Sequence, residues 1–247
     1  MKQKKILWYT GLVLALLLFP LIAKADIHIK KMKHTEAFSM MGHTEPAKDE
    51  EAGMWIAKDK FRNDEGEKMT WIVRYDKKKI YIVNHENKSY SETDIPINFD
   101  QLLNDQAKQM MGMFKASATV TDTGETQKIK NWNCKKYILE INMGMMGMQM
   151  PLTQTIWASK DVGIDLNLYQ KLYGEVMAAN PMFKDIIDEL KKLEGFPIRT
   201  EMSMSMMGAE MKSNEEVVSI EKKSAPAGTY DIPEGYTKAA YNPFMQR

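Results

Sequence analysis

Alternating apolar and polar residues predict β-strands along most of the chain. The clearest case is KMTWIVRYDKKKIYIV, in which Trp71, Val73 and Tyr75 share one face of a first strand. Ile80 and Ile82 share one face of a second strand, and the intervening DKKK is a turn, so this segment predicts a β-hairpin. The same period of two predicts a strand running into a turn at 53–66, and further strands at 26–33, 117–129, 132–143, 149–161, 198–207 and 210–223.

Two regions follow a helical period instead. The helix predicted at 98–115 begins at Asn98, which forms a capping-box pattern with Gln101. Two helical segments are expected within 165–193, where apolar residues recur every three to four positions. Residues 34–51 are polar and are expected to form a loop. This order of elements favours a single α+β domain, in which helices gather on one face of one antiparallel sheet.

The first 25 residues have the pattern of a signal peptide. A basic start, MKQKK, precedes an apolar run at 6–22, and AKA then presents Ala23 and Ala25 at the positions that a signal peptidase reads. The apolar run is shorter than the ~20 residues needed to span a bilayer. We therefore expect cleavage after Ala25, a signal peptide at 1–25, a domain at 26–247, and a periplasmic or secreted protein.

Charge and cysteine content narrow the function classes. Four of the 34 basic residues, all lysines, lie in the first 25 residues, which leaves 30 basic against 33 acidic residues. This net charge of −3, without a basic stripe, argues against a nucleic-acid partner. Cys134 is the single cysteine and cannot form an internal disulfide, so we expect it to be a small buried apolar residue.

Motifs of catalysis are missing from the sequence. It contains no HExxH, no GxSxG, no glycine-rich phosphate loop and no Cys–His pair at a recognisable spacing. Aspartate and glutamate are scattered through predicted turns and helix surfaces, as solvated charges usually are. We expect a protein that is not an enzyme, carries no cofactor and is a monomer.

Methionine is the residue that stands out in the composition. The chain has 22 methionines, and 21 of them follow the predicted signal peptide. Leucine is normally among the commonest residues, yet only nine leucines lie in the same part of the chain. In EMSMSMMGAEM, a strand would place Met202, Met204 and Met206 on one face and serines on the other.

A second cluster, NMGMMGMQM, uses glycine as the spacer. In a regular strand Met143 and Met145 would share one face, and Met146, Met148 and Met150 would share the opposite face. The two glycines make a bulge or kink plausible, and this would bring all five methionines to one side.

These methionines have three possible roles, which the sequence leaves open. They can be a core in which methionine replaces leucine, the usual role of an apolar stripe. They can line a pocket that adapts to apolar ligands of variable shape, because the thioether side chain is flexible and polarisable. They can also bind Cu(I) or Ag(I), since soft thioethers select soft ions. The candidate metal ligands are His34, Met40, Met41, His43, Met143, Met146, Met207 and Met211.

The ordered set of segments resembles a known family. The segments are YDKKKIYIVNHENKSYSE, NWNCKKYILEI, TIWASKD, GFPIRTEM, VVSIEKK and YDIPEGYTK. They resemble a family of exported bacterial proteins with a domain of unknown function, related in fold to the lipoprotein carriers LolA and LolB. The resemblance implies a half-open antiparallel barrel with helices on its concave face, and in the carriers that cavity holds acyl chains. No motif here maps onto the carriers' lipoprotein-handling residues.

Pattern and resemblance together predict a non-enzymatic binding protein. We expect it to hold an apolar small molecule, a lipid or an acyl chain, between the curved sheet and a lid formed by the helices at 98–115 and 165–193. Envelope proteins are possible further partners. The alternative is a methionine-rich soft-metal binding protein of the envelope. The candidate lining residues are Trp71, Met145, Met148, Met150, Trp157, Met202, Met204 and Met206.

Overall fold

The computed structural model describes residues 25–40, 42–145, 148–179, 183, 186–206 and 209–241. The strands are β1 (Asp26–Thr35), β2 (Phe38–Met40), β3 (His43–Glu45), β4 (Lys48–Ile56), β5 (Lys60–Glu65), β6 (Met69–Arg74), β7 (Lys79–Asn84), β8 (Ser89–Asp94), β9 (Phe114–Ile129), β10 (Trp132–Met145), β11 (Met148–Ser159), β12 (Phe196–Met206), β13 (Ala209–Lys223) and β14 (Thr237–Lys238). The helices are α2 (Phe99–Leu102), α3 (Asp105–Gly112), α4 (Leu166–Ala178) and α5 (Ile187–Leu190), with a 3-10 turn, η2 (Tyr75–Lys77).

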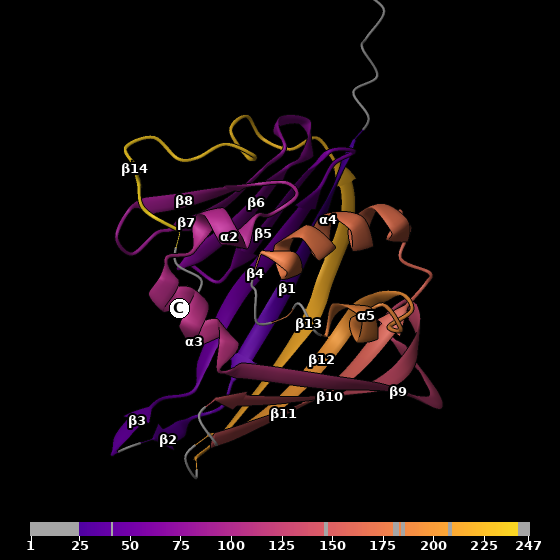
Figure 1. Cartoon of the computed structure of the whole chain (residues 1–247). Helices are drawn as coiled ribbons and strands as arrows, with labels where there is room; N and C mark the ends of the chain where they lie inside the picture. The colour runs from indigo at the N-terminus through magenta and orange to yellow at the C-terminus, as the bar shows by residue number, and fades with distance from the viewer. Residues whose placement is uncertain are drawn as a thin grey trace, which may run out of the picture.

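Twelve of these strands form one large curved sheet that remains open (Figure 1). Its order is β14-β8-β7-β6-β5-β4-β1-β13-β12-β11-β10-β9, and β2 and β3 form a separate hairpin. Every pairing from β8 to β9 is antiparallel, and the short β14 is parallel to β8. The prediction of a curved antiparallel sheet with a few helices is confirmed at this level, and the shape is consistent with a half-open barrel.

The sheet consists of two antiparallel meanders joined by the first strand. Strands β4 to β8 form one meander and β9 to β13 form the other, while β1 pairs with β4 on one side and β13 on the other. The predicted hairpin is confirmed as β6 and β7, in which Trp71 lies opposite Ile82 and Val73 opposite Ile80. Local alternation therefore sets each hairpin, whereas the place of β1 depends on long-range pairing.

The loop expected at 34–51 is wrong. This segment contains the end of β1, the β2–β3 hairpin and the first half of β4. His34 pairs with Asp49 and Thr35 pairs with Lys48, so the β1–β4 ladder continues through polar residues. Most side chains here are exposed or half-buried. A ladder with little burial lacks the apolar alternation by which a strand is recognised, because that alternation reflects burial of one face.

The single helix expected at 98–115 is also wrong. Asn98 caps the four-residue α2, accepting a hydrogen bond from the Gln101 backbone N–H as predicted. Leu103 then adopts an extended conformation, and the Asn104 side chain accepts a hydrogen bond from the Ala107 backbone N–H at the start of α3. This second cap competes with helix continuation, as asparagine often does.

No helix among the described residues is long and apolar enough to cross a membrane.

Helix α4 lies on the inner side of the curved sheet and contacts β5 and β6 (Figure 1). Its buried residues, Tyr169, Leu172 and Val176, recur at helical spacing and join a core with Phe61 and Trp71. A second core cluster lies beside α5, which contacts β9. The expected second helix of 165–193 is short, since α5 spans only four described residues.

Replacing Asp165 by alanine is expected to lower the free energy of unfolding by about 1 kcal/mol. Asp165 is the N-cap of α4, and its side chain accepts a hydrogen bond from the Leu168 backbone N–H at 3.0 Å. The measurement is urea denaturation followed by circular dichroism. The control is Asn167→Ala at an exposed position within α4, which is expected to be neutral or slightly stabilising because alanine has the higher helix propensity. Equal effects of the two substitutions would contradict the assigned cap.

Candidate functional site

The register of β10 to β13 places several methionines on one face of the sheet. Met204 lies opposite Met211 on β13 and opposite Leu152 on β11. Met150 lies opposite Met143 on β10. Residues directly opposite in an antiparallel ladder share a face, and so do residues two apart along a strand. We call this surface the methionine wall, and its members with described side chains are Met143, Met150, Leu152, Met202, Met204 and Met211.

The methionine wall belongs to the inner face of the sheet. Ile156 is on the same face of β11 as Leu152, and it packs with the buried Ile186 beside α5. Side chains on this face are less buried the farther they lie from the helices. Tyr137 and Ile156 are only 2% and 3% exposed, whereas every member of the wall is half-buried. The wall is therefore an inner apolar surface that the described helices cover only in part.

Five of the eight predicted lining residues fall into three groups. Met150, Met202 and Met204 lie on the methionine wall. Trp71 also faces the interior, but it packs in the core beneath α4. Trp157 lies opposite Lys136 and Arg199, on the reverse face of β11 from Ile156. The ammonium group of Lys136 lies 5.7 Å from the centroid of the Trp157 ring.

The remaining lining candidates lie at the tips of hairpins. Met145 pairs with Met148 where β10 turns into β11, and Met206 pairs with Ala209 where β12 turns into β13. The glycine-spaced cluster is thus the hairpin of β10 and β11 and not one regular strand, so Met143 and Met150 lie on the same face and not on opposite faces. Met146 lies outside the described residues, and so do the side chains of Met145, Met148 and Met206.

The candidate metal ligands are distributed over several elements. His34 Nδ1 lies 2.7 Å from Asp49 Oδ1 across the β1–β4 ladder. Met40 pairs with His43 in the β2–β3 hairpin, whereas Met143 and Met211 belong to the methionine wall. Among the described residues, no group of three or more histidine, cysteine, aspartate or glutamate residues could hold a metal ion. Met41 and Met207, like Met146, lie outside the described residues.

A charged cluster, which sequence reasoning missed, lies between the methionine wall and α4. Lys31 Nζ donates a hydrogen bond of 2.7 Å to Glu215 Oε1, although the Lys31 side chain is only 9% exposed. The same ammonium group lies 5.7 Å from the ring centroid of Phe196, which packs edge-on against Tyr169 at 4.8 Å. A sequence signal existed, because Lys31 occupies the position expected for an inward-facing residue after Ile29, but its partner is 184 residues away.

Glu65 and Trp71 extend this cluster onto β5 and β6. Asn63 on β5 lies directly opposite Trp71 on β6. Glu65 follows Asn63 by two residues, so it is the diagonal neighbour of Trp71 on the same face. Burial raises the pKa of the Glu65 carboxyl, which the nearby Trp71 indole and Lys33 partly offset. Burial and the nearby Glu65 likewise raise the pKa of Tyr173 on α4. The Glu65 side chain nevertheless stays partly exposed to solvent at the end of β5.

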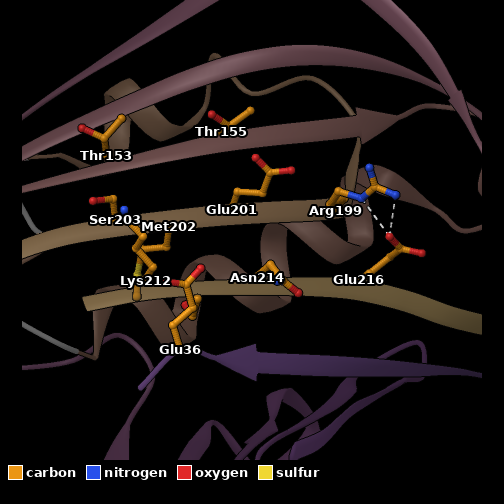
Figure 2. Close-up of a pocket in the computed structure, with 11 residues that line it drawn as sticks. Glu36, Thr153, Thr155, Arg199, Glu201, Met202, Ser203, Lys212, Asn214 and Glu216 are labelled. Atoms are coloured by element: carbon orange, nitrogen blue, oxygen red, sulfur yellow. Dashed lines mark hydrogen bonds and ion pairs between the residues drawn. The ribbon is translucent and has the colours of Figure 1, made fainter. Parts of the chain in front are cut away.

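The outer face of β11, β12 and β13 carries a different, polar groove (Figure 2). Its volume is about 590 Å³, and its lining includes Thr155, Glu201 and Asn214. Arg199 Nη2 lies 2.7 Å from Glu216 Oε2 in this groove. Burial alone would raise the pKa of Glu216, but hydrogen bonds from Lys130 and Arg199 hold it below its ordinary value. The charges of Arg199 and Glu216 therefore already have partners within the protein.

Cys134 lines a second groove of about 570 Å³, to which residues of β9, β10 and β11 contribute. It is free and only 2% exposed, as the sequence predicts. Burial raises the pKa of its thiol, which disfavours the reactive thiolate.

A comparison with known protein families identifies the family of this chain. A family profile described as "Domain of unknown function (DUF4412)" matches residues 38–236. The protein belongs to the DUF4412 family. In this DUF4412 protein the match covers every strand from β2 to β13 in part or in full, whereas β1, with Lys31, precedes it. No curated protein matches the chain.

Proposed function

We propose that this DUF4412 protein is an exported, non-enzymatic carrier that holds a lipid or acyl chain between its curved sheet and its helices. The observation that carries this proposal is the half-buried methionine wall on the inner face. Core side chains nearer the helices are almost fully buried, so the wall has apolar surface left to cover. An apolar surface of this kind, beside polar neighbours, is typical of a ligand-binding groove.

The chemistry of methionine suits such a ligand. Its unbranched side chain changes shape readily, and it therefore packs against chains of varied length and curvature. Each methylene group that the ligand buries contributes about 0.8 kcal/mol. The proposed architecture is the half-open barrel of the LolA/LolB type, working as a monomer in the periplasm or outside the cell after removal of residues 1–25.

A substitution pair on β12 tests the proposal. The probe is N-phenyl-1-naphthylamine, a neutral apolar dye whose fluorescence rises in an apolar site. Met204→Glu places a charge on the wall and is expected to weaken dye binding at least about ten-fold, because burying the carboxylate is costly. Ser203→Glu is the matched control, since Ser203 points to the other face and lies opposite Lys212. Absence of dye binding, or equal losses in both variants, would reject the proposal.

Soft-metal binding is the second candidate, and one observation favours it. Met204–Met211 and Met143–Met150 are directly opposed pairs, which brings their Cβ atoms to roughly 4.5–5.5 Å. Replacing Met202, Met204 and Met211 together by leucine separates the two functions. A carrier should keep its dye binding because volume and apolarity remain, whereas a Cu(I) protein should lose its sulfur ligands. Stoichiometric Cu(I) that resists bathocuproine, without dye binding, would establish the metal site instead.

A further inference from the structure

The groove beside Cys134 contains a buried hydroxyl group without a hydrogen-bond partner. Tyr137 lines this groove of about 570 Å³ and is only 2% exposed. Among the residues that the structure describes, the Tyr137 hydroxyl makes no hydrogen bond. Leaving a buried hydroxyl unsatisfied destabilises a folded protein, so most such groups find a partner. An unsatisfied hydroxyl on a residue that lines a groove therefore marks a place where a ligand can supply the missing partner.

This groove lies at the other end of β10 from the methionine wall. Lys135 precedes Tyr137 by two residues on β10, so both line the groove from the inner face of the sheet. Met143 follows Tyr137 by six residues on the same face, which is roughly 20 Å along the strand. Leu139 and Ile141 lie between them and are buried. The groove is therefore separate from the surface that we propose for the acyl chain.

Lysines outnumber carboxylates in the lining of the groove. Its charged residues are Lys128, Lys135, Lys160, Asp161 and Glu194. Lys160 Nζ lies 2.6 Å from Glu194 Oε2, and Lys135 pairs with a residue outside the lining, Asp122. An ammonium group has three donors, so each of these lysines can also bind a further acceptor. Lys128 on β9 forms no ion pair within the described part of the chain, and its charge is available to a ligand.

These groups favour an anion over other ligands. A ligand acceptor at the Tyr137 hydroxyl lies near positive charge, because Lys135 Nζ is 5.8 Å from the centroid of the Tyr137 ring. An anionic acceptor is attracted by the lysines, a neutral acceptor gains only the hydrogen bond, and a cation is repelled. The methylene groups of the lysine side chains also offer apolar contacts to a carbon skeleton. A groove of this volume is in the range of small-molecule sites.

We propose that this groove binds a small organic anion, a carboxylate or a phosphate ester, to which the Tyr137 hydroxyl donates a hydrogen bond. The two kinds of anion share negatively charged oxygen atoms that accept hydrogen bonds from a hydroxyl and from ammonium groups. Lys128, Lys135 and Lys160 supply the attracting charge. The site goes beyond the carrier function and does not depend on it.

Four sugars of similar size and different charge test the ligand class by isothermal titration calorimetry at low ionic strength. The probes are glucose 6-phosphate, gluconate, neutral glucose and cationic glucosamine. We expect at least one of the two anions to bind with a Kd of about 1 mM or tighter, and at least about ten-fold more tightly than glucose or glucosamine. The tighter anion distinguishes a phosphate ester from a carboxylate. Equal affinity for glucose, or no binding of either anion at about 10 mM, would overturn the proposal.

The substitution Tyr137→Phe tests the role of the hydroxyl, because it removes this group and keeps the ring. It is expected to weaken anion binding about ten-fold. Without ligand, the midpoint of urea denaturation should stay unchanged or rise, since the hydroxyl has no hydrogen bond to lose. Unchanged anion affinity in this variant would overturn the assignment of Tyr137.

A pair of lysine substitutions on β9 tests the position of the site. Lys128→Gln is expected to weaken anion binding several-fold, because it removes a charge from the lining. Lys115→Gln is the matched control, since Lys115 is also exposed on β9 but lies outside the lining. It should keep the affinity of the unaltered protein. Equal losses in both variants would show an effect of net charge alone and would overturn the site.

Discussion

Replacing Phe196 by alanine is expected to lower the free energy of unfolding by about 3–5 kcal/mol. Phe196 begins β12 and is fully buried in the core where the sheet meets α4. Its ring packs against Tyr169 with a centroid distance of 4.8 Å, and Lys31 Nζ lies over its face at 5.7 Å. The substitution removes both contacts and leaves a cavity that the surrounding β-sheet cannot readily close.

Urea denaturation followed by tryptophan fluorescence measures this loss. The matched control is Phe38→Ala, because Phe38 is half-buried in the separate β2–β3 hairpin. It is expected to lower the free energy of unfolding by no more than about 1 kcal/mol. A loss at Phe196 as small as that at Phe38 would mean that α4 is not packed on the sheet through this residue.

Replacing Glu215 by alanine is expected to lower the free energy of unfolding by about 2–3 kcal/mol. The substitution leaves the ammonium group of Lys31, which is 9% exposed, without its anionic partner. Removing one partner of a fully buried pair costs about 3–5 kcal/mol, and we expect less here because Glu215 keeps some contact with solvent. The pair links β1 to β13, so its loss acts at the join between the two meanders.

A double variant tests whether the lost Lys31–Glu215 ion pair causes this destabilisation. Lys31→Met with Glu215→Leu is expected to be nearly as stable as the unaltered protein, since two apolar residues can replace a buried ion pair. The exposed pair Lys191–Asp188 is the control, and its removal is expected to leave the free energy of unfolding nearly unchanged because solvent screens both charges. If Glu215→Ala and the double variant are equally unstable, the ion pair is not the cause.

The candidate site was predictable from the sequence only where it depends on local alternation. Met202 and Met204 occur at alternate positions of a strand, and such residues must share a face whatever surrounds them. The charged cluster around Lys31 and Glu65 was not predictable in this way. Trp71 is the one predicted lining residue that belongs to it, but its neighbour Glu65 resembles an ordinary charge before a turn. Only the register of β5 against β6 shows that the two are adjacent.

The face that Trp157 occupies illustrates the same limit. Ile156 and Trp157 are consecutive apolar residues, and alternation cannot decide which of them faces the interior. Pairing settles the question, because Trp157 meets Lys136 and Arg199, whereas Ile156 meets Tyr137 and packs beside α5.

The sequence by itself determined the local elements of this protein. Alternation predicted the β6–β7 hairpin, and the side chain of Asn98 predicted a helix start, because hairpins and caps depend on neighbours along the chain. Only the tertiary structure decided that β1 lies between β4 and β13, and that Lys31 meets Glu215. The pairing of β1 with β13 joins residues almost 200 positions apart, and no local pattern specifies which distant strand a given strand will pair with.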